Sequence, residues 1–198
     1  MLKIFGLSLS LLFTISVNAK ECRQVMDPKS ISVEWTGYKF TEKEGVTGKF
    51  EKIEVESSMS GADIQSVVRD IKFKINGLKF DAGNLARNIN LKRHFFKKFA
   101  DKAMITGHIK EMPKSKSGEL KLVLVVNAVR SNIPMKYTIK DGKFEATGTM
   151  EMSDFKLNDA LVSISKACFD LHKGKDGVSK TWPTVDLKAS AKFKEECS

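Results

Sequence analysis

The sequence of 198 residues has few of the side chains that build catalytic or metal sites. Its three histidines, His94, His108 and His172, occur singly, without the HxH or HExxH spacing that holds zinc. The GxSxG, P-loop and GxGxxG motifs are missing as well. These absences argue against a metalloenzyme, a serine hydrolase and a nucleotide-binding protein. We expect a protein without catalytic residues, metal or cofactor, and an enzyme that uses a cavity is the least favoured alternative.

Cysteine is scarce too, because only Cys22, Cys168 and Cys197 are present. None belongs to a CxxC pair, so neither a redox motif nor a zinc site is predicted. Cys168 lies in "SKACFD", where a half-buried structural cysteine or a disulfide partner is favoured over a nucleophile. Cys22 and Cys197 bracket the rest of the chain and are the disulfide candidates. On the chain-entropy model, a bond that closes so large a loop is worth roughly 5 kcal/mol.

No long apolar run occurs after the first nineteen residues, "MLKIFGLSLSLLFTISVNA". These begin with one charge, Lys3, continue with an apolar run from Ile4 to Val17, and end in small residues up to Ala19. The run is short for a transmembrane helix, which needs about 20 residues. We therefore predict a cleaved secretory signal peptide over residues 1–19, with an uncleaved anchor as the alternative, and a single domain over residues 20–198.

Charge of one sign is in excess, with a formal net charge of +10, or +9 after Lys3 is removed with the signal peptide. A strongly basic protein favours anionic surroundings such as lipid headgroups, phosphates, wall polymers or nucleic acid. Export argues against nucleic acid, because an exported protein seldom meets it. Contact with an anionic membrane surface remains as a candidate interaction, and solubility alone is the simpler explanation of the charge.

Alternation of apolar and polar residues is the dominant pattern in the chain. Residues 31–35, "ISVEW", and 71–75, "IKFKI", each place three apolar side chains on one face. Residues 136–146 form two such runs around Asp141-Gly142, a dipeptide that favours a type I′ hairpin turn. Residues 184–193 alternate in the same way, which is typical of an antiparallel sheet with one dry face.

Residues 83–102, "GNLARNINLKRHFFKKFADK", break this pattern and predict a helical segment. Asn84 is a suitable N-cap, and Leu91 lies on the same side of a helix as the phenylalanines that follow it. The segment is compatible with a nucleic-acid helix, a membrane-surface helix, or a lid or plug of a barrel. Export disfavours the first, and the lack of a broad apolar face disfavours the second.

Many short antiparallel strands with a minor helical insertion predict an all-β fold. We favour a closed or nearly closed antiparallel β-barrel, because closure removes exposed sheet edges, and a β-sandwich is the alternative. A barrel of about eight strands either fills its interior with side chains or holds one slender ligand. An even number of up-and-down strands would also bring Cys22 and Cys197 to the same rim.

Several motifs resemble the YceI-like family of lipid-binding and polyisoprenoid-binding proteins, over about residues 28–194. Residues 32–50, "SVEWTGYKFTEKEGVTGKF", resemble its opening, with matches at Val33, Trp35, Gly48 and Phe50. Later parts of the chain also fit, in "MITGHI" and "FEATGTMEMSDFKL". In the connecting segment Arg87, Leu91, Phe95 and Phe96 match the family pattern, whereas Asn88 and Asn90 stand where the family commonly has Asp and His.

The resemblance implies a lipocalin-like barrel, found largely in the periplasm, whose apolar interior holds a long isoprenoid, quinone or fatty-acyl amphiphile. It also favours a segment 83–102 that covers or plugs the barrel. Arg87 and Lys92 are candidates to hold a head group at the mouth. The oligomeric state, monomer or homodimer, stays open. The predicted ligand-binding wall residues are Val33, Trp35, Phe50, Ile71, Phe73, Ile75, Phe95, Phe96, Phe99, Phe144, Met150, Met152 and Phe155.

The alternative function is an exported basic interaction module whose barrel is filled with its own side chains. Such a protein would bind anionic envelope components through its surface, and this binding would fall steeply with salt. Binding of an apolar chain inside the barrel would depend little on salt. The state of the lumen, hollow or packed, therefore separates the two hypotheses.

Overall fold

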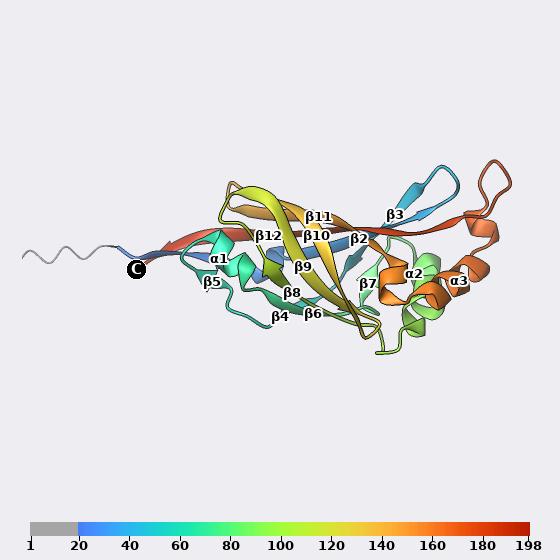
Figure 1. The fold of residues 1–198 in the computed structure, drawn as a ribbon, viewed down its shortest axis with the longest axis horizontal. Helices are drawn as coiled ribbons and strands as arrows, with labels where there is room; N and C mark the ends of the chain where they lie inside the picture. The colour runs from blue at the N-terminus through green and yellow to red at the C-terminus, as the bar shows by residue number, and fades with distance from the viewer. Residues whose placement is uncertain (1–19) are drawn as a thin grey trace, which may run out of the picture.

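The computed structural model describes residues 20–198, so the predicted signal peptide lies outside the described residues. The molecule is elongated, with strands along its length and helices near its two ends (Figure 1). Within the described part of the chain, no helix is long and apolar enough to cross a bilayer. The helices are α1 (Ile64–Arg69), α2 (Leu85–His94) and α3 (Asn158–Ala167), and four 3₁₀ helices are η1 (Pro28–Ser30), η2 (Phe96–Lys98), η3 (Met152–Phe155) and η4 (Asp170–His172).

In the described part of the chain, twelve strands form one antiparallel sheet in the order β4-β6-β8-β9-β10-β11-β12-β2-β3-β7, with β1 paired to β12 and β5 paired to β1. The strands are β1 (Cys22–Met26), β2 (Ser32–Lys39), β3 (Glu44–Phe50), β4 (Ile53–Val55), β5 (Ser60–Gly61), β6 (Lys72–Asn76), β7 (Phe80–Asp81), β8 (Met104–Glu111), β9 (Ser117–Val126), β10 (Val129–Lys140), β11 (Lys143–Glu151) and β12 (Thr181–Cys197).

The two ends of this order meet, because they belong to the same two stretches of chain. β3 continues after two residues into β4, and β6 leads through a short turn into β7. The β3–β4 stretch pairs with the β6–β7 stretch at Phe50 and Phe80 and again at Ile53 and Ile75. Between these two points, the Glu51 N–H donates to the Lys79 carbonyl at 3.0 Å. Counted this way, the curled sheet of residues 20–198 has eight staves, meaning eight strand positions around the barrel: β2, β3/β4, β6/β7, β8, β9, β10, β11 and β12.

This architecture confirms the predicted lipocalin-like, mostly β fold, and its local rules match the sequence pattern. On β10, Ile133, Met135, Tyr137 and Ile139 are buried while the residues between them are exposed. The turn from β10 to β11 uses positive φ angles of 50° and 68° at the Asp141-Gly142 dipeptide, as a type I′ turn requires. Alternate side chains therefore enter the barrel on every long strand.

The sequence predicts one helical segment after residue 19, whereas residues 20–198 contain three α-helices. In the predicted segment, the Asn84 side chain caps α2 by accepting a hydrogen bond from the Arg87 N–H at 3.0 Å. Helices α1 and α3 were not predicted, because α1 has only six residues and α3 follows Leu157 without a side-chain N-cap. Helices this short depend on tertiary packing rather than on a strong local signal.

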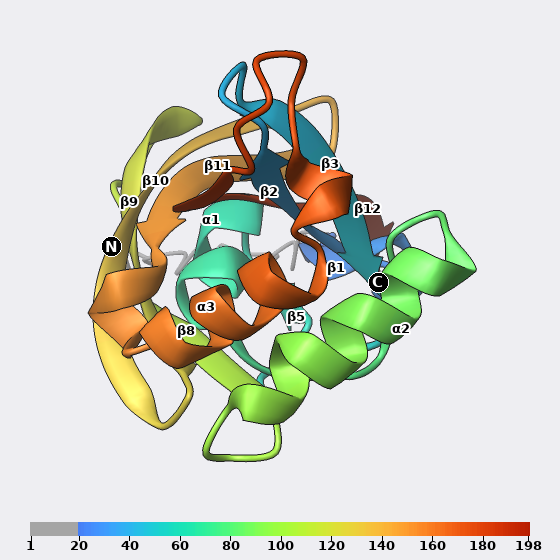
Figure 2. The ribbon, with the colours of Figure 1, turned by 90° about the vertical axis from the view of Figure 1, so that its right-hand side faces the viewer.

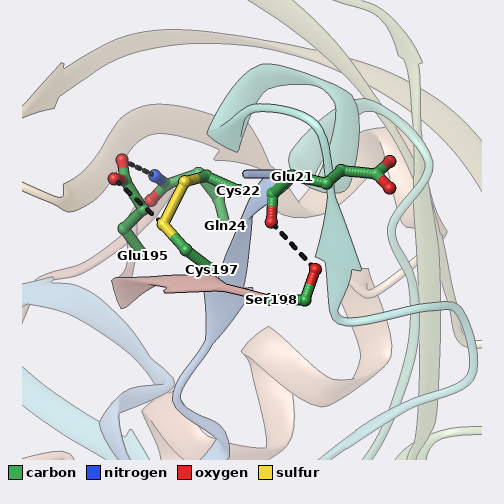
Figure 3. Close-up of a disulfide and its surroundings, with 6 residues drawn as sticks. All are labelled: Glu21, Cys22, Gln24, Glu195, Cys197 and Ser198. Carbon is green, nitrogen blue, oxygen red and sulfur yellow. Dashed lines mark hydrogen bonds between the residues drawn. A yellow bond between two sulfur atoms is a disulfide. The ribbon is translucent and has the colours of Figure 1, made fainter. Parts of the chain in front are cut away.

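A disulfide joins Cys22 and Cys197 across 175 residues of sequence (Figure 3). We predicted that an even number of barrel strands would bring the two cysteines to the same rim. The contact arises differently, because β1 is not one of the eight strand positions around the barrel. β12 is 17 residues long, and it pairs with β2 along its first part and with β1 along its last part. In this register Cys22 lies directly opposite Cys197, and the Ser198 N–H donates to the Glu21 carbonyl at 3.0 Å beyond it.

Removing this bond in the double variant Cys22→Ser/Cys197→Ser should lower the free energy of unfolding by about 2–5 kcal/mol, because the unfolded chain gains freedom. Urea denaturation followed by circular dichroism measures the change. The native protein should lose the same stability when a reductant is added, whereas the double variant should not respond to it. Equal denaturation midpoints for the oxidised protein and the variant would contradict the prediction.

Candidate binding cavity

The barrel encloses a cavity of about 590 Å³ that all eight staves line. Its lining on β12 extends from Thr181 to Ala191, which is about 33 Å along a strand at the usual rise per residue. A volume of this size falls within the range of about 300–1,000 Å³ that small-molecule sites occupy. The lumen is therefore hollow, long and narrow rather than packed solid.

Most residues that the sequence placed at the wall line this cavity. Phe155 does not, because its side chain is fully buried within the protein core. Lys92 also lies outside the lining, with its Nζ 5.5 Å above the centre of the Phe80 ring. The predicted residues that the structure brings together around the cavity are Val33, Trp35, Phe50, Ile71, Phe73, Ile75, Arg87, Phe95, Phe96, Phe99, Phe144, Met150 and Met152.

Sequence reasoning missed a second set of lining residues, which come from β8, β9, β10 and the segment around α3. Their signal on the strands was present, since apolar residues recur at every second position of residues 120–126, and Ile105 and Ile109 share one face of a strand on either side of Gly107. The contribution of α3 follows a helical spacing instead, since Ile164 and Cys168 lie four residues apart. The missed residues include Ile105, Ile109, Leu120, Leu122, Leu124, Val126, Met135, Ile164, Cys168, Leu171 and His172.

The phenylalanines of residues 83–102 turn inward and join an aromatic cluster. The Phe96 ring lies 5.0 Å from Phe80, 5.2 Å from Phe95 and 5.5 Å from Phe99, measured between ring centres. Trp35 packs edge-on against Phe80 and Phe96 at 5.8 and 6.4 Å. The lysines at 97 and 98 remain exposed. The segment is therefore docked on the barrel with its aromatic side inward.

Gly48 allows the Trp35 ring to lie flat against the neighbouring strand. The two residues face each other across β2 and β3, and a Cβ at position 48 would lie 2.2 Å from the indole. The Trp35 Nε1 is buried and has no hydrogen-bond partner among residues 20–198. Because Trp35 also lines the cavity, the wall contains one N–H donor that no described residue satisfies.

Helices α2 and α3 lie across one end of the barrel (Figure 2), where Asn84, Arg87, Asn90, His172 and Thr181 belong to the lining. Asn84, Arg87 and Asn90 recur every third residue, so one face of α2 looks into the cavity. Arg87 Nη1 donates to the Ala82 carbonyl at 2.7 Å, which holds the guanidinium at this position. We call this end of the barrel the mouth.

The opposite end of the lumen is closed by apolar side chains. There α1 begins with a capping box in which Asp63 and Ser66 exchange hydrogen bonds. The helix contributes Val68 to the lining, beside Met26 of β1, and these two side chains are only 2% and 1% exposed. The cavity therefore has a cluster of polar side chains at its open end and apolar side chains at its closed end, and the lining between them also includes Ser32, Lys188 and Ser190.

Two titratable groups at the mouth are held in their neutral forms. Burial raises the pKa of the Cys168 thiol, against the smaller effect of a hydrogen bond from Asn90. Burial, and to a lesser extent the charge of Lys39, lowers the pKa of His172, whose Nδ1 lies 2.7 Å from Thr181 Oγ1. Near neutral pH the mouth therefore offers neither a thiolate nor an imidazolium.

Within the described residues, one group of side chains has metal-ligand spacing, namely Cys22, Glu195 and Cys197. The two sulfurs of this group are bonded to each other in the disulfide. They are therefore not thiolates, which are the form in which cysteine binds metals. The group lies at the exposed tip of β1 and β12, away from the mouth.

Gly48→Ala should reduce stability by about 1–3 kcal/mol, because the added methyl group overlaps the Trp35 ring and forces a shift. The matched control is Gly37→Ala on β2, where an added Cβ meets no atom within 4 Å. Thermal melts of both variants test the difference. If both variants had the same melting temperature as the native protein, the proposed role of Gly48 would be wrong.

His172 should titrate below its ordinary pKa of 6.5, and stability should depend on pH accordingly. A histidine with a lowered pKa in the folded state binds fewer protons than in the unfolded chain. The contribution of His172 to stability is therefore complete above pH 6.5. It is lost as the pH falls from 6.5 to the pKa of His172 in the folded protein. NMR titration, assigned with His172→Asn, measures the pKa, and Lys39→Met should move it upward. A titration at or above 6.5 would contradict the prediction.

The geometry agrees with comparisons to known proteins. A model of the YceI-like domain matches residues 25–193 of this chain. A search of curated protein sequences finds no significantly similar relative. A solved polyisoprenoid-binding domain from Saccharophagus degradans is 10% identical with a TM-score of 0.58, covering 89% of this chain and 99% of its own. BcnA from Burkholderia cenocepacia is 14% identical with a TM-score of 0.53, covering 84% and 98%.

At such identities the solved structures show a shared fold, and the family model carries the assignment because it spans most of the chain. On this evidence the chain belongs to the YceI-like family.

Proposed function

We propose that this protein is a non-enzymatic carrier that holds a long-chain amphiphile of the isoprenoid type inside its barrel. The observation that carries the proposal is the hollow lumen of about 590 Å³, mostly apolar along its length and with a cluster of polar side chains at one end. Support also comes from the similar domain of Saccharophagus degradans, which is described as polyisoprenoid-binding. The tail would occupy the lumen, with its tip toward α1.

The lumen is suited to a flexible hydrocarbon tail. Burial of each methylene group is worth about 0.8 kcal/mol, so a tail of about ten carbons supplies ample gross affinity before the costs of binding are subtracted. Met135, Met150 and Met152 lie along the wall, and methionine adapts its shape to irregular apolar partners. The shape of the lumen thus favours a class of tails, of isoprenoid, quinone or fatty-acyl type, rather than one compound.

The head group would remain at the mouth. Arg87 is fixed by its bond to Ala82 and retains further N–H donors, which suit a phosphate, carboxylate or carbonyl oxygen. Asn84 and Asn90 add amide groups to the same face of α2. Lys92 lies outside the lining, so it would act only on a group that extends beyond the mouth.

The periplasm is the proposed location of this carrier. The features that support it are the first nineteen residues, with the composition of a signal peptide, and the bond between Cys22 and Cys197. Disulfides persist in oxidising compartments such as the periplasm.

A hollow lumen favours the carrier over a surface-binding module with a filled barrel. A cavity enzyme is less well supported, because burial holds the Cys168 thiol in its protonated form and no reactive thiolate is available near neutral pH.

Ala146→Phe should block the tail, because Ala146 lines the lumen on β11 and a phenyl ring there occupies the space that the tail needs. We expect at least about a tenfold loss of affinity, the equivalent of two buried methylenes. Displacement of a fluorescent fatty acid measures the affinity, and native mass spectrometry of protein purified from the periplasm detects a retained amphiphile.

The matched control is Thr147→Phe, which adds the same ring on the exposed face of β11 and should bind as the native protein does. A second lumen variant, Ala189→Leu, guards against a folding defect, and circular dichroism checks both folds. If no amphiphile is retained, if Ala146→Phe binds normally, or if binding falls steeply with added salt, the carrier proposal fails.

A further inference from the structure

We infer that the mouth of the barrel is a docking surface for an anionic lipid bilayer. The large apolar side chains that are exposed within residues 20–198 all lie on the elements at this end, on α2, on α3 and on residues 169–178 that follow it. The other end and the barrel wall carry none of them in the described part of the chain. We call this set the mouth patch: Leu85, Ile89, Val162, Phe169, Leu171 and Val178.

The exposure of the mouth patch is large for apolar side chains. Leu85 is 76% exposed, Leu171 63% and Phe169 56%. Helix α2 turns one face into the cavity through Arg87, while Leu85 and Ile89, one turn apart, lie on another face. Leu171 both lines the cavity and is exposed, so the patch is continuous with the opening. Exposed apolar groups that cluster around an opening mark an interaction site.

The charge at this end identifies the kind of partner. Residues 85–98 contain five basic side chains and no acidic one, and residues 158–180 contain four lysines against three aspartates. These two segments therefore carry a net charge of +6, whereas the formal net charge of all residues 20–198 is +9. About two thirds of the net charge lies on roughly a fifth of the chain, around the apolar patch. Arg93 and Lys166 are among the exposed cations.

Apolar tips among cations match the interface of an anionic bilayer, where the tips enter the acyl boundary and the cations contact the headgroups. A second copy of this chain fits poorly, because the same surface on both partners would bring +6 against +6. Another protein also fits this surface less well than a bilayer does, since the centres of protein interfaces are depleted in lysine. No long amphipathic helix is needed, because the patch is assembled from α2, α3, η4 with Phe169 before it, and the protruding loop that follows η4 (Figure 1).

Vesicle flotation tests the contribution of charge. The native protein should float with vesicles of phosphatidylcholine and phosphatidylglycerol, and only weakly with phosphatidylcholine alone. The variant Arg93→Gln/Lys166→Gln should bind the anionic vesicles at least about tenfold more weakly. The matched control, Lys110→Gln/Lys194→Gln, removes the same charge from exposed positions on β8 and β12 toward the opposite end and should bind as the native protein does.

The apolar contribution has its own variants. Leu85→Ser/Phe169→Ser should lose binding to anionic vesicles by a similar factor, whereas Leu85→Ile/Phe169→Leu, which keeps the apolar area, should retain it. The tryptophan introduced by Phe169→Trp should fluoresce at a shorter wavelength when vesicles are added, and brominated acyl chains in those vesicles should quench its emission. Thr147→Trp on the barrel wall is the control, with the same background from Trp35 and Trp182, and its extra emission should not change.

The inference concerns a surface and can fail independently of the carrier proposal. Leu85→Ser/Phe169→Ser should still bind the fluorescent fatty acid in solution, while Ala146→Phe should still float with vesicles. The inference is overturned if the native protein ignores anionic vesicles, or if both charge variants bind equally. It is also overturned if Leu85→Ser/Phe169→Ser converts a dimer into a monomer in light scattering, because a second copy would then cover the patch.

Discussion

The closure of the sheet is the constraint on which the other features depend. Two kinked stretches, residues 44–55 and 72–81, pair with each other and join the ends of the strand order. Once the ring is closed, alternate side chains of every stave point at a common axis, and their sizes decide how much of the interior they fill. Ala146 and Ala189 face each other across β11 and β12, and small side chains there leave the lumen open.

The helices give this tube a direction. Helix α1 and β1 close one end with buried apolar side chains, and the disulfide joins β1 to the last residues of β12 beyond it. Helices α2 and α3 leave polar side chains facing the cavity at the other end. The protein therefore presents a tail-shaped space behind a polar opening, and its exposed apolar and basic residues surround the same opening. Uptake, head-group contact and surface docking would all take place at one end.

Sequence patterns predicted features that rest on neighbouring residues. Alternation identified the long strands, the Asp141-Gly142 dipeptide identified a turn, and Asn84 identified the start of α2. The same patterns did not separate Phe155 from the residues at the wall, because a buried side chain and a cavity-lining side chain obey the same alternation. They also missed α3, because it follows Leu157 without a side-chain N-cap of the kind that Asn84 gives α2.

The sequence by itself therefore determined which side chains avoid water, where the strands turn, and the family to which the chain belongs. The tertiary structure decided that the lumen is hollow, that α2 and α3 stand at its polar end, and that Cys22 meets Cys197 through the extra pairing of β1. The physical reason is the range of the interactions involved. Alternation and capping act over a few residues, whereas closure of the ring sets distances between segments that lie far apart in the chain.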